Sequence, residues 1–132
     1  MLAELGKFEE VTVVAYCDTD ERRLSSAARR ARGAQGYPDA ASMLAAHSDI
    51  DAVLVATPTH LHRQPCEEAL AAGKHVYCEA PLAHSVTDAR AIAAAAASSG
   101  KVFQTGLQGR ANPVYGLARA FVRPGAMRAL GA

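Results

Sequence analysis

The stretch DAVLVATPTHLHRQPCEEALAAGKHVYCEAPL, residues 51–82, decides the fold of this chain. It contains two short β-branched and apolar runs, at 51–56 and 75–79, which are typical of buried strands. Between them a turn leads into a segment of helical composition that ends near Ala72, and Gly73 is a residue type that commonly terminates a helix. A strand, a helix and a strand at this spacing predict a βαβ unit with parallel strands and a right-handed crossover.

The same alternation continues in both directions along the chain. We expect strands at 11–17 and 101–106, a short strand near 34–37, and helices at 21–32, 39–47, 86–99 and 113–122. Asp39 and Ser85 are expected to cap the second and third of these helices. The predicted class is therefore α/β with a parallel sheet, in one domain over residues 1–123, followed by a tail at 124–132.

Composition excludes several functional classes. Half of the 132 residues are hydrophobic and the net charge is +1, so the sequence predicts a folded core and no nucleic-acid partner. No apolar run approaches the ~20 residues of a membrane span. Three cysteines without a C-x-x-C pair favour buried or half-buried free thiols, with no zinc site, in a reducing, cytoplasmic compartment. The basic cluster Arg29, Arg30 and Arg32 fits cations at a helix C-terminus, with a phosphate site as the alternative.

Polar residues follow the predicted strands where each strand ends. They are Asp18, Thr57 to His60, Glu79 and Gln108. In an open parallel sheet, ligands bind beyond the carboxyl ends of the strands. We therefore expect a ligand site at this edge.

Each of these residues also has a structural interpretation. Asp18 can accept both ribose hydroxyls of an adenosine and repel a 2′-phosphate, which favours NAD over NADP, or it can simply cap a helix. Glu79 can bind a ribose or cap the neighbouring backbone. Thr57 and Pro58 can contact a cofactor or form a plain turn. His60 lies in an H-x-H pair that lacks a third metal ligand, so no metal site is predicted.

The pieces ending at Asp18, the segment 51–82 and the run GLQGR at 106–110 resemble the N-terminal domain of the Gfo/Idh/MocA oxidoreductases. The resemblance implies a Rossmann-like doubly wound parallel sheet. It places Asp18 at the adenosine ribose, Thr57, Pro58 and His60 along the dinucleotide, Glu79 at the nicotinamide ribose, and Gln108 near the nicotinamide. It also implies hydride transfer between NAD(P) and a sugar or polyol substrate. Both a monomer and a homo-oligomer are compatible with the sequence.

The sequence departs from the family pattern in three respects. No G-x-G-x-x-G phosphate loop is present, and Met1 to Gly6 resembles the end of the helix that follows that loop. We therefore expect a fragment that lacks the first strand, with an open edge or improper pairing between the strands at 11–17 and 51–56, and a natural N-terminus that lies elsewhere.

The second departure is the expected absence of the family's substrate domain, which carries the catalytic His. The third is Ala80, which stands where the family has Lys; Lys74 lies too far along the strand to replace it, while His84 and Arg110 are candidates. The leading expectation is the NAD-binding part of a sugar or polyol oxidoreductase that is inactive alone. The alternatives are an NAD-dependent glycosidase or epimerase without net redox, a non-catalytic dinucleotide-binding remnant, and a flavodoxin-like receiver domain, for which the acidic cluster is missing.

Overall fold

The computed structural model describes residue 5 and residues 7–107, 109 and 112–122. Eleven elements alternate along this part of the chain: β1 (Ala15–Cys17), α2 (Glu21–Arg30), β2 (Gln35–Tyr37), α3 (Ala40–Ala46), β3 (Ala52–Val55), the 3₁₀ turn η1 (Thr59–Leu61), α4 (Arg63–Ala71), β4 (His75–Cys78), α5 (Val86–Ser99), β5 (Phe103–Thr105) and α7 (Pro113–Val122). The predicted α/β class is confirmed. No helix in these residues is long and apolar enough to cross a membrane.

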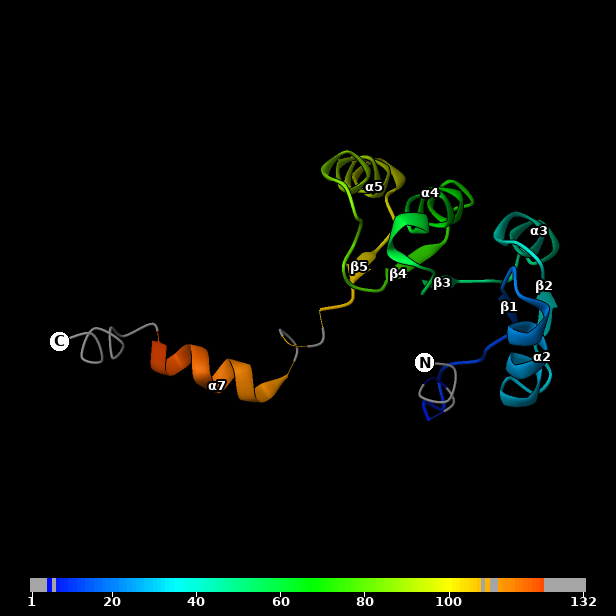
Figure 1. Ribbon diagram of the computed structural model, residues 1–132, viewed down its shortest axis with the longest axis horizontal. Coiled ribbons are helices and arrows are strands. Elements are labelled where there is room, and N and C mark those ends of the chain that lie inside the picture. Colours follow the sequence, from blue (N-terminus) through cyan, green and yellow to red (C-terminus); the bar gives the residue numbers. More distant parts are fainter. Residues whose placement is uncertain (1–4, 6, 108, 110–111, 123–132) are drawn as a thin grey trace.

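The described strands form two parallel sheets. β1 pairs with β2, and β3, β4 and β5 pair in that order. β1 and β3 lie at the facing edges of the two sheets and do not pair with each other (Figure 1). The expected break beside β1 and β3 is therefore present.

Helices cover the strands unequally. α3, α4 and α5 lie along one side of the strands, and α2 lies on the other side beneath β1 and β2 (Figure 1). α4 packs against both of its helical neighbours. This arrangement is doubly wound at β1 and β2 only, because no described helix covers the second face of β3, β4 and β5.

The core lies between β3, β4 and the helices α4 and α5. Ile92, Cys66, Ala69 and Cys78 are fully buried, and Val55 packs against them from β3. Each large apolar side chain buried here contributes roughly 1.5–3 kcal/mol relative to exposure. The short side chains of α4 allow it to lie close to the sheet.

Polar residues start the helices where the sequence indicates. Asp20, Asp39 and Ser85 cap α2, α3 and α5 by accepting backbone N–H groups of the first turn. Gly73 and Gly100 end their helices with φ of +74° and +66°, the left-handed region that glycine adopts without strain.

The strands at 11–17, 51–56, 75–79 and 101–106 and the helix at 21–32 are all shorter than predicted. The first strand begins at Ala15 rather than residue 11, because β2 is only three residues long and the other edge of β1 has no described partner. β5 begins at Phe103 instead of 101, β3 covers 52–55 instead of 51–56, and α2 ends at Arg30 instead of 32. The predicted tail at 124–132 lies outside the described residues.

Candidate functional site

Most of the predicted site residues lie at the carboxyl ends of parallel strands. Asp18 directly follows β1, Thr57 and Pro58 follow β3, and Glu79 follows β4. Gln108 lies outside the described residues, as does Arg110. We call this edge of the strands the carboxyl edge.

Asp18 is held by the first turn of α2 without acting as its cap. Its Oδ1 accepts the N–H of Asp20 at 3.0 Å, while Asp20 itself caps the helix by accepting from Arg22 at 2.8 Å. The guanidinium of Arg23 lies 4.0 Å from Oδ2 of Asp18. The simple helix-cap interpretation of Asp18 is therefore wrong, and its half-buried carboxylate keeps lone pairs for a ligand.

The loop after β3 is fixed by a histidine that the sequence did not single out as a site residue. His62 is 1% exposed; its Nε2 lies 2.8 Å from the carbonyl oxygen of Thr57 and its Nδ1 3.1 Å from that of Leu82. It thus joins the loop after β3 to the loop after β4. A signal for it exists in the sequence, since His62 begins the buried helical stripe continued by Cys66, Ala69 and Leu70.

Glu79 lies against a glycine at the end of β5. A methyl group built on Gly106 would lie 2.8 Å from Oε2 of Glu79 and 2.5 Å from the hydroxyl of Tyr77. Oε2 also accepts the N–H of Ala80 at 3.3 Å, which is the capping contact that the sequence left open. A half-buried carboxylate with one long hydrogen bond retains the capacity to accept a ligand hydroxyl.

Two exposed histidines meet above this edge. The rings of His60 and His84 pack edge to face with centroids 6.4 Å apart, and Nδ1 of His84 lies 3.7 Å from a carboxylate oxygen of Asp88. His84 is therefore turned toward α5 and the loop after β3. Lys74 donates to the carbonyl of Ser48 at the opposite end of the strands, as its position predicts.

The described residues contain no group of three side chains arranged for a metal ion. The three cysteines are free thiols. Burial raises the pKa of the Cys66 thiol and that of the Cys78 thiol. Cys17, the last residue of β1, is exposed, against the expectation of buried or half-buried thiols.

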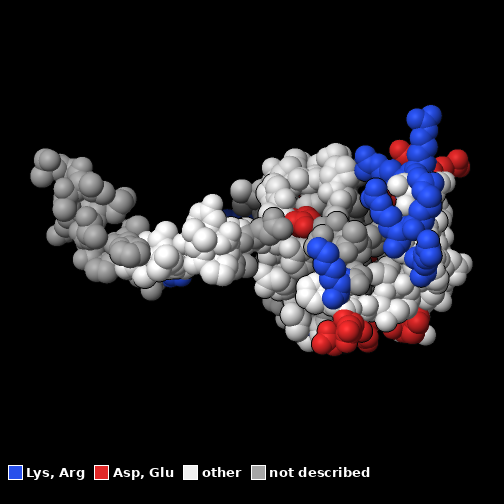
Figure 2. Space-filling model, turned by 90° about the horizontal axis from the view of Figure 1, so that it is seen from below, with Lys and Arg blue, Asp and Glu red and all other residues white. Residues whose placement is uncertain are grey.

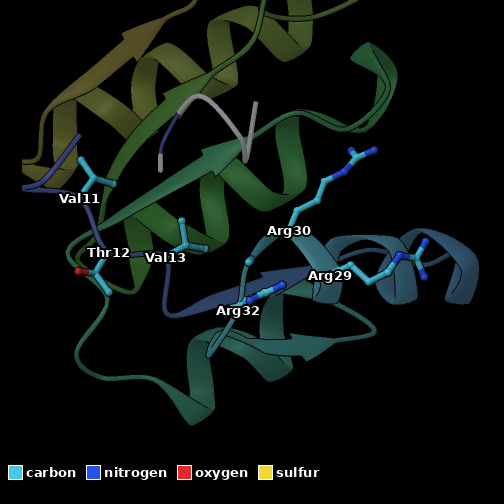
Figure 3. A pocket seen from close by; sticks show the side chains of 7 residues that line it. Val11, Thr12, Val13, Arg29, Arg30 and Arg32 are labelled. Atoms are coloured by element: carbon cyan, nitrogen blue, oxygen red, sulfur yellow. The ribbon is translucent and has the colours of Figure 1, made fainter. Parts of the chain in front are cut away.

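The basic cluster lies apart from the carboxyl edge. Arg29 and Arg30 form the last turn of α2, and with Arg32 they surround a hollow of about 370 Å³ whose other wall is the segment Val11–Val13 (Figure 3). Basic side chains dominate this part of the surface (Figure 2). Arg29 and Arg30 lie at the C-terminus of α2, where the helix dipole favours cations.

Two half-buried carboxylates at the ends of β1 and β4, and a fixed loop after β3, lie at the edge where an open parallel sheet binds its ligands. Residues 2–107 match the family described as the oxidoreductase family with an NAD-binding Rossmann fold. The chain is 36% identical over 116 residues to inositol 2-dehydrogenase of Acidothermus cellulolyticus, covering 87% of this chain and 34% of that protein. It is 33% identical over 95 residues to a glycosyl hydrolase family 109 protein of Shewanella amazonensis, covering 63% and 20%.

A solved structure agrees with these sequence relatives. The WlbA dehydrogenase of Chromobacterium violaceum, in complex with NADH and UDP-GlcNAcA, superposes with a TM-score of 0.85 at 30% identity, over 93% of this chain and 35% of that one. Fold and site together define a dinucleotide-binding α/β domain. The chain belongs to the Gfo/Idh/MocA oxidoreductase family and has its NAD-binding Rossmann fold. It spans about a third of the length of these dehydrogenases.

Proposed function

We propose that this chain forms the ribose-binding half of an NAD site in an oxidoreductase that acts on a sugar or polyol. The observation that carries the proposal is the placement of Asp18 and Glu79 at the carboxyl ends of β1 and β4, each with acceptor capacity left over. The inositol dehydrogenase and the UDP-sugar complex among its relatives support a polyhydroxylated substrate.

The candidate residues at the carboxyl edge fit the two riboses of NAD better than its pyrophosphate. Asp18 would accept the adenosine ribose hydroxyls, Glu79 the nicotinamide ribose hydroxyls, and Thr57 and Pro58 would lie against the dinucleotide between them. The sequence has no glycine-rich loop for the pyrophosphate. NAD when bound supplies the hydride chemistry, and the residues named here bind and orient it.

Saturation-transfer NMR, which detects weak ligands, tests the assignment on the full 132-residue chain. With NAD⁺ present, we expect transfer to the protons of both riboses. Asp18→Asn should reduce transfer to the adenosine ribose, and Glu79→Gln should reduce transfer to the nicotinamide ribose. Asp51→Asn is the matched control, because Asp51 lies at the amino end of β3. Equal loss in all three variants, or no transfer at all, would contradict the proposal.

A second candidate is an NAD-dependent glycosidase or epimerase without net redox. Ala80 favours it, because the family resemblance places an ammonium at that position and a methyl group can neither move a proton nor hold a substrate hydroxyl. The similarity to a glycosyl hydrolase family 109 protein supports it as well.

Restoring the ammonium separates the two candidates. In a polypeptide that joins this segment to a substrate domain, Ala80→Lys should raise the rate of NADH formation from inositol if the net reaction is oxidation. An unchanged rate, with release of sugar from a glycoside, would favour the second candidate.

The free thiols support a further proposal, that the protein works in the reducing cytoplasm.

A further inference from the structure

Tyr77 and Glu79 bring two polar groups to one point of the carboxyl edge. They lie two residues apart, on β4 and directly after it, so their side chains share one face of the sheet. The position that a Cβ atom of Gly106 would take lies 2.5 Å from the Tyr77 hydroxyl oxygen and 2.8 Å from Oε2 of Glu79. Gly106 is buried, and its N–H donates to the carbonyl oxygen of Cys78 at 2.7 Å. Because Gly106 has no side chain, both groups can reach the same point.

The hydroxyl and the carboxylate leave hydrogen-bonding capacity unused. Among the described residues, nothing bonds to the Tyr77 hydroxyl, and Oε2 of Glu79 accepts one long bond, from the N–H of Ala80 at 3.3 Å. A phenol hydroxyl can donate a hydrogen bond, whereas an ionised carboxylate can only accept. Both side chains are half-buried, where an unpaired polar group costs free energy. The pair therefore suits a third group that accepts from the phenol and donates to the carboxylate.

The end of β1 has the same sequence pattern without the same geometry. Tyr-Cys-Asp at 16–18 corresponds to Tyr-Cys-Glu at 77–79, and each tyrosine packs on a glycine of the neighbouring chain segment. Tyr16 lies directly opposite Gly36 in the ladder, and the three atoms nearest to a Cβ of that glycine all belong to Tyr16. Tyr77 lies opposite Gln104 but reaches the glycine two residues nearer the carboxyl edge. Only the second phenol therefore meets a carboxylate oxygen over its glycine.

We propose that Tyr77 is a further binding residue of the cofactor site. Its hydroxyl donates to one hydroxyl group of the nicotinamide ribose, and the same ribose hydroxyl donates to Glu79. The inference rests on the proposed function, which assigns the nicotinamide ribose to Glu79. It adds the donor that completes the hydrogen bonds of this ribose hydroxyl.

The other groups of a dinucleotide fit the pair less well. A phosphate oxygen only accepts hydrogen bonds, and the carboxylate of Glu79 would repel its charge. A carboxamide divides its donor and its acceptor between two atoms. A ribose hydroxyl accepts and donates through a single oxygen, as two groups directed at one point require.

Two half-ligands test the role of Tyr77 on the full 132-residue chain. Nicotinamide mononucleotide carries the nicotinamide ribose alone, and 5′-AMP carries the adenosine ribose alone. Saturation-transfer NMR titrations give a dissociation constant for each. Tyr77→Phe should weaken binding of the mononucleotide about threefold to tenfold, the value of one hydrogen bond, and leave 5′-AMP unchanged. The 5′-AMP titration also shows whether the variant is folded.

Tyr16→Phe is the matched control, because it removes a half-buried phenol hydroxyl that packs on a glycine without a carboxylate. It should leave the affinity for nicotinamide mononucleotide unchanged. Glu79→Gln should weaken that affinity. The double variant with Tyr77→Phe should lose less than the product of the two single losses, because both side chains bind one hydroxyl.

Fluorine NMR gives a readout that a merely structural role would not move. The chain contains four tyrosines, so 3-fluorotyrosine labelling gives four signals that single Phe substitutions assign. Nicotinamide mononucleotide should shift the signal of Tyr77 and not that of Tyr16. The Tyr77 shift should shrink in the Glu79→Gln variant.

The outcomes separate this inference from the proposed function. If Glu79→Gln weakens the mononucleotide and Tyr77→Phe does not, Tyr77 only packs on Gly106 or holds a water, and this inference alone fails. Losses that multiply in the double variant would place the two side chains on different groups and contradict it too. Weaker binding of inositol, with nicotinamide mononucleotide unchanged, would assign Tyr77 to the substrate instead. No binding of the mononucleotide to the unaltered chain would contradict the proposed function and this inference together.

Discussion

Nε2 of the buried His62 lies 2.8 Å from the carbonyl oxygen of Thr57, and this contact fixes the loop that follows β3. The other ring nitrogen lies 3.1 Å from the carbonyl oxygen of Leu82, beyond Glu79 and Ala80. One side chain therefore sets the separation of two loops that carry candidate cofactor residues. The ring of His62, at the start of α4, holds these two loops together from within the core and does not lie among the candidate cofactor residues.

His62→Ala should destabilise the chain by about 2–4 kcal/mol, because it leaves a cavity and removes the buried ring that contacts the carbonyl oxygens of Thr57 and Leu82. Chemical denaturation followed by circular dichroism measures the loss. His84→Ala, at an exposed position, should change stability by less than about 0.5 kcal/mol. Equal effects of the two substitutions would show that His62 does not hold the loops.

Gly106→Ala should displace the carboxylate of Glu79, because the added methyl group would lie 2.8 Å from Oε2 and closer still to the hydroxyl of Tyr77. We expect a loss of about 1–3 kcal/mol from overpacking and a weaker NMR transfer to the nicotinamide ribose of NAD⁺. Adding Tyr77→Phe should recover part of both losses. Gly109→Ala is the control, since its methyl group would meet Tyr115 at an ordinary 3.8 Å.

Asp18→Ser should shift the nucleotide preference toward NADP. The substitution removes the negative charge that would face a 2′-phosphate. It also removes one of the two carboxylates that lie 4.0 Å from Arg23, whose guanidinium can then meet the phosphate while Asp20 remains beside it. A tenfold change in the ratio of the two dissociation constants corresponds to about 1.4 kcal/mol. Asp20→Ser keeps a helix-capping oxygen and should leave the ratio nearly constant; a comparable shift there would argue against a specific role for Asp18.

The start of α5 should make stability depend on pH in the acid range. Hydrogen bonding to the Ser85 hydroxyl, followed by the contact with Arg63, lowers the pKa of Asp88 below its ordinary value near 3.8. A carboxyl whose pKa is lower in the folded state stabilises it above the unfolded pKa, and this contribution is lost as the pH falls through the folded value.

The urea midpoint of the chain should therefore fall as the pH drops below about 4. Asp88→Asn should flatten this part of the curve, and Asp51→Asn should not. An identical acid limb in the Asp88 variant would assign the fall to other carboxyl groups, such as Asp39, whose pKa Ser42 also lowers.

Local patterns in the sequence predicted the helices most closely. The segment 86–99 matches α5 at both ends, because Ser85 and Gly100 are local signals that need no tertiary partner. Strand lengths were less accurate: residues 11–14 have strand composition, but a strand is counted only where it pairs, and β2 offers three residues.

The candidate site divides in the same way. Asp18, Thr57, Pro58, His60 and Glu79 could be named from their positions after strands, since parallel strands bring their carboxyl ends to one edge. The role of His62 could not, because it depends on the carbonyl of Leu82, twenty residues away.

By itself, the sequence determined the class of the fold and the residues of the carboxyl edge, because these follow from periodicity, caps and the spacing of strands and helices. The family follows from the resemblance carried by particular motifs, above all residues 51–82. The sequence left two alternatives for β1 and β3, and only the tertiary structure decided for an open edge over improper pairing. It also decided that Leu54 is 38% exposed and that Cys17 is exposed. Pairing and burial are relations between segments distant in the chain. Whether two such segments pair or bury each other is known only when the positions of both segments in the folded structure are known.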